Sequence, residues 1–269
     1  MKSEKNAYIL GTDTEELHRL GLQHQVWAAE ARKGWEIAEF SSGQHLLDLG
    51  CGPGYCSMEL AYMVGKKGSV LAIDKSKQYL DFLATQAKHH DLNITIQQAE
   101  FDTTELVPNS LDGVYHRWAL AWMSDPQAAL EKISAAMVPG AAIVGHEYYD
   151  WSTFQTEPEL PGVNKGIKSI YKRFADSDFE IDIGRYLPRL YADAGLEVIS
   201  VRPMAKIGLP GDLVWQWPKS FLELFLTKQT GFMSQSEIDI AILELHELEA
   251  LPGASILCPT MTEVVAVKV

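Results

Sequence analysis

Short apolar runs alternate with stretches of helical periodicity along the first half of the chain. Apolar runs bounded by turn residues are typical of buried strands, and apolar residues at three- and four-residue spacing are typical of one helix face. We expect strands at about 46–50, 69–74, 94–97, 113–116 and 141–145. This alternation predicts an α/β fold, a doubly wound and mostly parallel sheet with helices on both faces.

The helices between these strands have recognisable ends. The segment 55–64 follows a glycine-rich turn, and Ser76 is placed to cap the next helix. Asp125 followed by proline is a helix start, and Pro139-Gly140 is expected to end that helix before the fifth strand. These signals place most of the turns in the predicted fold.

The order changes after residue 150, where two long segments lack clear strand patterns. Residues 151–182 are expected to form a loop with one helix. Residues 206–260 are expected to hold a helix near 218–228 and a second one opened by a capping box of Ser234 and Glu237. Long connections of this kind are usually lids or binding loops, and we expect the same here.

These patterns predict one main domain at residues 44–269 that carries the two lid segments. The segment 1–43 is expected to be a helical extension. It either packs on the sheet as an ordinary helix or covers the ligand site, in which case Tyr8, His18 or His24 would reach over the ligand.

Composition narrows the choice of partners. With 269 residues and 46% hydrophobic content, the chain can bury a full core. Its 36 acidic and 23 basic residues give a net charge of −13, which opposes binding to phosphate backbones, so nucleic acid is not expected as a partner.

The cysteines and the lengths of the apolar runs indicate the cellular compartment in which the protein is expected. Cys51, Cys56 and Cys258 form neither a paired framework nor a metal-ligand spacing, so we expect no metal site and a reducing compartment. The N-terminus lacks the apolar run of a signal peptide, and no stretch reaches membrane-spanning length. We therefore expect a cytoplasmic protein that has no membrane partner and is either a monomer or a homodimer.

The most informative stretch is 46–60, which reads as a strand, a glycine turn and the start of a helix. Gly50, Gly52 and Gly54 let the backbone adopt conformations closed to other residues and let a ligand approach the main chain. Amides at the start of the helix would point at that ligand. Asp48 stands before the glycines, where a carboxylate would repel a pyrophosphate and attract a cation.

A nicotinamide dinucleotide fold is the main alternative for this turn. That fold needs the pattern Gly-x-Gly-x-x-Gly. If Gly50 and Gly52 are the first two glycines, the third position falls on Tyr55. This mismatch argues against a dinucleotide site.

The stretch from Leu47 to Gly54 resembles the first motif of the Rossmann-like S-adenosylmethionine-dependent methyltransferases, a family with a seven-stranded sheet. The resemblance extends to Asp74, which ends the second strand, to the acid–aromatic pair after the third, and to the Pro-Gly before the fifth. The N-terminal segment is similar to bacterial members that act on small molecules.

The resemblance implies S-adenosylmethionine as cofactor and S-adenosylhomocysteine as product. Asp48 would lie near the ammonium of the methionine part, Asp74 would accept both ribose hydroxyls, and Glu100 would take the adenine amino group, where the family more often has Asp. By the same resemblance, the cofactor-binding residues are Asp48, Gly50, Gly52, Gly54, Asp74, Glu100, Phe101 and His116.

Candidates for the chemistry follow the fourth and fifth strands. A base is required only if the acceptor must lose a proton, and His116, His146 and Glu147 are the candidates. The alternative for His146 and Glu147 is a hydrogen-bond network at the strand end. Arg117 would hold a carboxylate or phosphate of the substrate.

Aromatic residues gather where the acceptor is expected, although some of them must belong to the core. They indicate a mostly apolar pocket suited to a small organic molecule. The expected pocket residues are Arg117, Trp118, Trp122, Tyr148, Tyr149, Trp151, Trp215 and Trp217.

The sequence therefore predicts a methyltransferase that moves a methyl group from S-adenosylmethionine to an oxygen or nitrogen atom of a small molecule by in-line displacement. Two alternatives stay open. One is chemistry on S-adenosylmethionine that moves no methyl group, such as synthesis of a modified cofactor. The other is a non-enzymatic module that only binds S-adenosylmethionine.

Overall fold

A computed structural model describes residues 14–101, 104–177, 179–228 and 232–269. The chain divides into two compact units. The sheet unit comprises residues 27–149, 179–204 and 261–269, and the helical unit comprises the described parts of 1–26, 150–178 and 205–260. The predicted domain bounds and the role of 151–182 and 206–260 as lids stay predictions, and Tyr8 lies outside the described residues.

The sheet unit contains the predicted alternation of strands and helices. Its strands are β1 (His45–Leu49), β2 (Ser69–Asp74), β3 (Ile94–Gln98), β4 (Leu111–Arg117), β5 (Met137–Asp150), β7 (Leu196–Met204) and β10 (Thr260–Lys268). Its helices are α2 (Tyr55–Val64), α3 (Lys77–His89), α4 (Pro126–Ala136), α6 (Leu187–Asp193) and the second half of α1 (Thr14–Ile37). Short 3-10 turns are η1 (Gly65–Lys67), η3 (Leu120–Trp122) and η5 (Ile183–Arg185).

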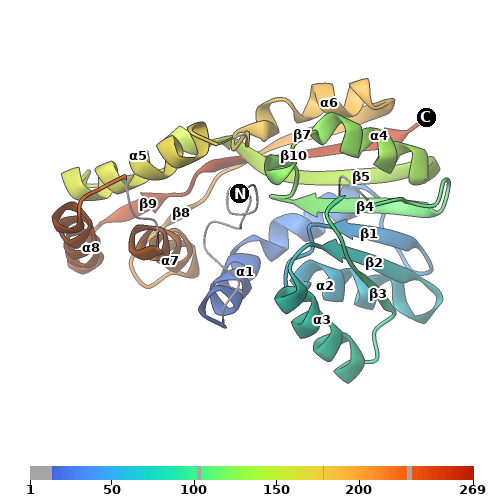
Figure 1. Cartoon of the computed structure of the whole chain (residues 1–269), viewed down its shortest axis with the longest axis horizontal. Coiled ribbons are helices and arrows are strands. Elements are labelled where there is room, and N and C mark those ends of the chain that lie inside the picture. The colour runs from blue at the N-terminus through green and yellow to red at the C-terminus, as the bar shows by residue number, and fades with distance from the viewer. Residues whose placement is uncertain (1–13, 102–103, 178, 229–231) are drawn as a thin grey trace, which may run out of the picture. The chain divides into compact units, whose positions relative to one another are not determined.

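These strands form one seven-stranded sheet in the order β3-β2-β1-β4-β5-β10-β7. The pairs β1–β2, β1–β4, β2–β3 and β4–β5 are parallel, whereas β10 is antiparallel to β7. Figure 1 shows α4 and α6 on one side of the sheet and α2 and α3 on the other. The predicted doubly wound α/β fold is confirmed, and the carboxyl ends of β1, β2, β4 and β5 meet at one edge.

Alternation along β1 divides the core of the sheet unit into two layers. Leu46 packs with Trp35 of α1 and Leu60 of α2, whereas Leu47 packs in the layer that contains Leu130 of α4. Burial of each such side chain stabilises the fold by about 1.5–3 kcal/mol. Because successive strand residues face opposite sides, Asp48 faces the layer of Leu46 and α2.

The structure corrects the prediction at the start of the fifth strand. Pro139-Gly140 does not end α4, which stops earlier, but lies inside β5. The pairing of β5 with β4 shifts register at this point, and Gly140 has φ +83°, so the two residues form a bulge. The strand continues to Asp150, and therefore His146 and Glu147 lie within it rather than in a loop beyond it.

The helical unit contains α5 (Pro161–Ala175), α7 (Leu213–Lys228) and α8 (Gln235–Ala250), together with the turn η4 (Trp151–Thr153). The capping box of Ser234 and Glu237 opens α8 as predicted. In contrast, α7 starts five residues before the predicted Pro218, at Leu213, after Asp212 accepts the amide of Gln216. A small antiparallel sheet of β6 (Gln155–Glu157), β9 (Ser255–Leu257) and β8 (Ile207–Gly208) was not predicted, because such short strands carry no periodicity.

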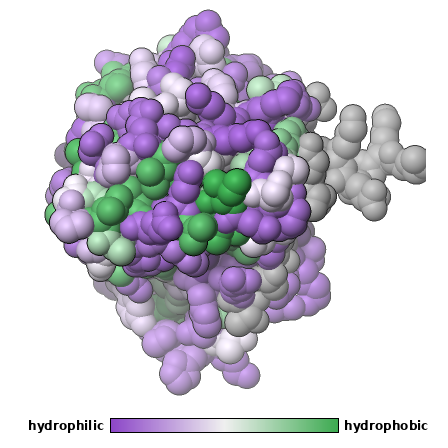
Figure 2. All heavy atoms as spheres, turned by 90° about the vertical axis from the view of Figure 1, so that its left-hand side faces the viewer, coloured by the Kyte–Doolittle hydropathy of each residue, from purple (hydrophilic) through white to green (hydrophobic). Residues whose placement is uncertain are grey.

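Some apolar side chains of the helical unit stay exposed. They include Ile240 and Leu243 of α8 and Leu251 just after it. Figure 2 shows the face that lies at the left of Figure 1, where green apolar areas are separated by purple polar ones. The predicted monomer or homodimer stays a prediction.

Gly34 allows close packing of α1 on the sheet. A Cβ atom at this position would lie 2.6 Å from Glu263 Oε2 and 2.8 Å from Val144 Cγ1, both in the sheet unit. Gly34→Ala should therefore lower the free energy of unfolding by about 1–3 kcal/mol, as overpacking does. Urea unfolding of the two proteins measures the difference. A variant as stable as the wild type, or more stable by the roughly 1 kcal/mol that Ala gains in a helix, would contradict this packing.

Candidate active site

The glycine turn between β1 and α2 is attached to the end of β2 by backbone hydrogen bonds. The amides of Gly50 and Cys51 both donate to the carbonyl of Ile73, at 2.9 and 3.1 Å. Gly50, Gly52 and Gly54 have φ values of +66°, +52° and +78°, in the left-handed region that other residues rarely adopt. The three glycines thus allow the backbone conformation of this turn, and the hydrogen bonds to β2 fix its position.

Asp74 continues this attachment with its side chain. Its Oδ2 accepts the amide of Gly52 at 2.9 Å, and its Oδ1 accepts the amide of Ser76 at 2.8 Å. Burial raises the pKa of Asp74, although the hydrogen bonds from Ser76 and Gly52 act in the opposite direction. The side chain is only partly buried, and each carboxylate oxygen keeps a lone pair for a further donor.

The space beside Gly52 is open. A Cβ atom on this residue would meet no atom of the described chain within 4 Å. The helix that follows, α2, starts at Tyr55, and the residue before it, Gly54, provides no side-chain cap for its first amides. Helix starts of this kind favour negative or hydrogen-bond-accepting ligand groups.

Asp48 belongs to β1 and lies inside the sheet unit, beside the first turn of α2. Its side chain is 2% exposed and accepts a hydrogen bond from the hydroxyl of Ser57 at 2.5 Å. Burial raises the pKa of Asp48 to about 7, against the lowering effects of the Ser57 hydrogen bond and the Arg117 charge. Ser57 was not predicted as a site residue, although its position in the first turn of the helix after the glycines is a signal for such a contact.

The predicted adenine contacts follow β3. Glu100 is exposed, and Phe101 is buried in the core layer that contains Ile73 and Leu120. Phe101 therefore has the apolar surroundings expected of a wall residue. The contacts of both residues with adenine stay predictions.

His116 and Glu147 bond to each other at the ends of β4 and β5. His116 Nδ1 lies 2.9 Å from Glu147 Oε1, and its Nε2 lies 2.7 Å from the hydroxyl of Tyr191 in α6. Both residues are 0% exposed. Burial raises the pKa of Tyr191 well above its usual value, as does the nearby Glu147. Tyr191 was not predicted, because it lies 75 residues away in the sequence.

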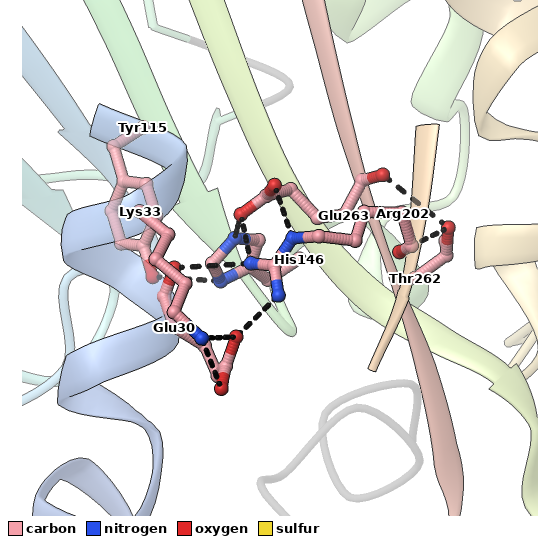
Figure 3. Close-up of polar contacts among 7 residues, drawn as sticks. All are labelled: Glu30, Lys33, Tyr115, His146, Arg202, Thr262 and Glu263. Carbon is pink, nitrogen blue, oxygen red and sulfur yellow. Dashed lines mark hydrogen bonds and ion pairs between the residues drawn. The ribbon is translucent and has the colours of Figure 1, made fainter. Parts of the chain in front are cut away.

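His146 belongs to a second buried network, shown in Figure 3. Its Nε2 lies 2.8 Å from Glu263 Oε2, and its Nδ1 lies 3.3 Å from the hydroxyl of Tyr115. Glu263 accepts two hydrogen bonds from Arg202, which also pairs with Glu30 of α1. Burial lowers the pKa of His146, although the hydrogen bond to Glu263 opposes this, so the ring is neutral at neutral pH.

The contacts of His146 and Glu147 are those of the hydrogen-bond network that was the alternative to catalysis, and His116 is bonded to Glu147. Each lies fully inside the sheet unit, and the partners are side chains or amides of the same unit. A direct role in proton transfer stays a prediction for all three.

Arg117, Trp118 and Tyr148 are brought together in the sheet unit. The guanidinium of Arg117 lies 5.0 Å from the ring centroid of Trp118, whose ring stacks on Tyr148 at 5.6 Å. Trp27 of α1 meets Trp118 edge to face at 6.3 Å. Burial lowers the pKa of Arg117, but nearby groups that include Cys56, Tyr115 and Asp48 raise it more strongly.

The other predicted pocket residues have different surroundings. In the sheet unit, Trp122 contacts Phe179, and Tyr149 is 48% exposed. In the helical unit, Trp151, Trp215 and Trp217 are buried core side chains. Trp151 packs against the rings of Phe154, Phe174 and Phe221, and Trp217 donates to Gln23 at 2.8 Å. Their contacts with an acceptor stay predictions.

In residues 14–101, 104–177, 179–228 and 232–269, no group of three or more His, Cys, Asp or Glu side chains is arranged as a metal site. No helix in the same ranges combines the length and apolar character needed to cross a membrane.

Residues 46–140 match the sequence profile of the family described as "Methyltransferase domain". A demethylmenaquinone methyltransferase of Desulfitobacterium hafniense (strain Y51) is 23% identical over 76% of this chain and 81% of its own length. An uncharacterized 37.1 kDa protein of a Streptomyces fradiae transposon is 29% identical over 61% of this chain, but only 47% of that protein is covered. Several Shewanella relatives, 22–23% identical over 67–70% of the chain, are named ubiquinone/menaquinone biosynthesis C-methyltransferases.

Among solved structures, a candidate methyltransferase of Bacillus halodurans C-125 superposes with a TM-score of 0.59 at 13% identity. The match covers 89% of this chain and 99% of that one. Residues 46–140 therefore form a methyltransferase domain, and the predicted resemblance to the Rossmann-like S-adenosylmethionine-dependent methyltransferases is confirmed. The protein is a methyltransferase, and its cofactor is S-adenosylmethionine.

The cofactor of this methyltransferase fits the geometry at the strand ends. Asp74 has lone pairs for further donors, and the open space at Gly52 lets a ligand approach the main chain. Asp48 supplies a carboxyl close to the turn.

Asp48 should make the free energy of unfolding depend on pH. Its folded pKa of about 7 exceeds the ordinary value of about 4, so the folded protein keeps a proton that the unfolded chain has released between these values. The contribution of Asp48 to stability is therefore complete below about pH 4 and is lost as the pH rises through about 7.

Urea unfolding of the ligand-free protein at pH 5 and pH 8 tests this. Asp48→Asn should lose less stability than the wild type between the two pH values. Equal losses in the two proteins would show that Asp48 has an ordinary pKa.

Proposed function

We propose that this methyltransferase binds S-adenosylmethionine along the ends of β1, β2 and β3 and moves its methyl group to a small organic molecule. The observation that carries the proposal is the pairing of Asp74 with the amide of Gly52, next to open space at the same glycine. This pairing supports the proposal, because a carboxylate can accept the hydroxyls of a ribose and an accessible main chain can border a methionine part.

The cofactor-binding roles proposed for the individual residues follow from this placement. Asp74 accepts the ribose hydroxyls, and the main chain at Gly50, Gly52 and Gly54 borders the methionine part. Asp48, at the start of α2, supplies the negative charge for the ammonium. Glu100 and Phe101, after β3, would contact the adenine.

S-adenosylmethionine supplies a methyl group on a positively charged sulfur, so the displacement needs no covalent help from the protein. The protein contributes orientation and exclusion of water. The strand ends of the sheet unit fix the donor, and the apolar environment around Trp118 and Tyr148 keeps water away from the reacting atoms. An added base is needed only for an acceptor that must lose a proton.

The acceptor atom has two candidates. The sequence-based expectation is oxygen or nitrogen. Carbon is the second candidate, because several relatives are named C-methyltransferases of ubiquinone and menaquinone biosynthesis. In either case the acceptor is a small molecule, since the net charge of −13 opposes a nucleic acid.

Asp74→Ala should weaken binding of S-adenosylhomocysteine by about a hundredfold, because two hydrogen bonds to a charged group are each worth about 1.5 kcal/mol. Isothermal titration calorimetry measures this. Asp81→Ala is a matched control, since Asp81 is an exposed acid of α3 that pairs with Lys77. No binding to the wild type, or equal loss in both variants, would contradict the proposed cofactor site.

Incubation with ¹³C-methyl cofactor should identify the acceptor. We expect transfer to at least one of a set of phenols, carboxylic acids, amines and hydroquinones. The NMR shift of the labelled methyl carbon then reports whether it is bonded to oxygen, nitrogen or carbon. Binding of the cofactor without transfer to any of these compounds would favour a non-methylating enzyme or a binding module.

A further inference from the structure

The turn that follows β4 has an unusual backbone. Trp118 has φ +53°, in a region that a bulky residue rarely adopts. Its amide donates to the carbonyl of His146 at 3.0 Å. Strained residues of this kind persist where the surroundings hold them, and they cluster at functional sites.

Glu147 holds the next two residues of this turn. Its Oε1 accepts the amides of Ala119 and Leu120 at 3.0 and 3.1 Å, and it also bonds His116 Nδ1 at 2.9 Å. Because Oε1 already accepts two amide protons, the Nδ1–H of His116 is the donor in this contact. One carboxylate oxygen thus receives three donors and is fixed in orientation.

The turn touches the cofactor loop. A Cβ atom on Gly50 would lie 2.7 Å from Ala119 Cβ. Gly50 and Ala119 are therefore packed against each other, and a shift of the turn after β4 displaces the glycine turn after β1.

The second oxygen of Glu147 differs from the first. Oε2 is buried and has no hydrogen-bond partner among the described residues. Buried polar atoms without partners are rare in folded proteins.

We propose that Glu147 is a positioning residue for methyl transfer, which holds the strained turn 118–120 against Gly50. This inference rests on the proposed function and adds to it how the methionine end of the cofactor is placed. Glu147 acts through the turn and not as a base, because Oε1 is committed to three donors and the whole residue is 0% exposed.

Two variants separate these roles. Glu147→Ala removes the acceptor, so the amides of Ala119 and Leu120 should exchange their hydrogens about tenfold faster, and the Kd for S-adenosylhomocysteine should rise about tenfold. Glu147→Gln keeps an oxygen acceptor and should stay within about threefold of the wild type in both measurements. Hydrogen exchange with mass spectrometry or NMR and calorimetry provide the two readouts.

Glu263→Gln is the matched control. It alters another buried glutamate that bonds a histidine of β5, so it should lower the unfolding temperature without changing the Kd for S-adenosylhomocysteine. A similar Kd change in Glu263→Gln would show that lost stability, and not the turn, weakens binding.

The outcomes separate this inference from the proposed function. Unchanged exchange and unchanged Kd in Glu147→Ala would overturn the positioning role. So would a Glu147→Gln variant that binds the cofactor normally and loses turnover with the acceptor found by the screen, because that result identifies a base. If the wild type binds no S-adenosylhomocysteine, the proposed function fails, and the exchange rates alone decide whether Glu147 holds the turn.

Discussion

The active-site architecture depends on the attachment of the glycine turn to the end of β2. Gly50 and Cys51 bond the carbonyl of Ile73, and Gly52 bonds the carboxylate of Asp74. Left-handed glycines are conformationally free in an unfolded chain, so a site built on them needs such restraints. Here the restraint and the proposed ribose acceptor are the same residue, and cofactor geometry is therefore coupled to the pairing of β1 with β2.

Two buried networks that include residues of β4 and β5 also hold the backbone through bonded side chains. Glu147 and His116 hold the turn after β4, and Glu263 joins β5 and β10 through His146 and Arg202. Buried acids are costly unless they are bonded, so each carboxylate is placed where it accepts several donors. The buried glutamates of the two networks, Glu147 and Glu263, therefore hold neighbouring parts of the sheet unit together.

The fold was predictable from local patterns. The helix at 55–64 and the strand at 69–74 have the predicted bounds, and Ser76 accepts the amide of Tyr79 as a cap should. Asp74 was predicted as a site residue from the resemblance to the methyltransferase family, and the apolar pattern placed it at the end of the second strand, where the structure has it. The bulge at Pro139-Gly140 was missed, since a Pro-Gly pair has the same signal in a bulge as in a turn.

Long-range contacts were not predictable. No spacing in the sequence relates His116 to Tyr191, or Glu263 to His146, because these pairs form only when the sheet is assembled. The aromatic residues show the same limit. Trp118 and Tyr148 stack in the sheet unit, whereas Trp215 and Trp217 fill the core of the helical unit, and sequence composition alone treats the four alike.

The most direct test of the central claim is a crystal structure with S-adenosylhomocysteine bound. The account predicts that the ribose hydroxyls lie within hydrogen-bond distance of the Asp74 carboxylate, with the homocysteine part next to Gly52. It also predicts that the hydrogen bond from Gly52 to Asp74 is kept. A ligand that binds elsewhere, or a ribose that makes no contact with Asp74, would contradict the account.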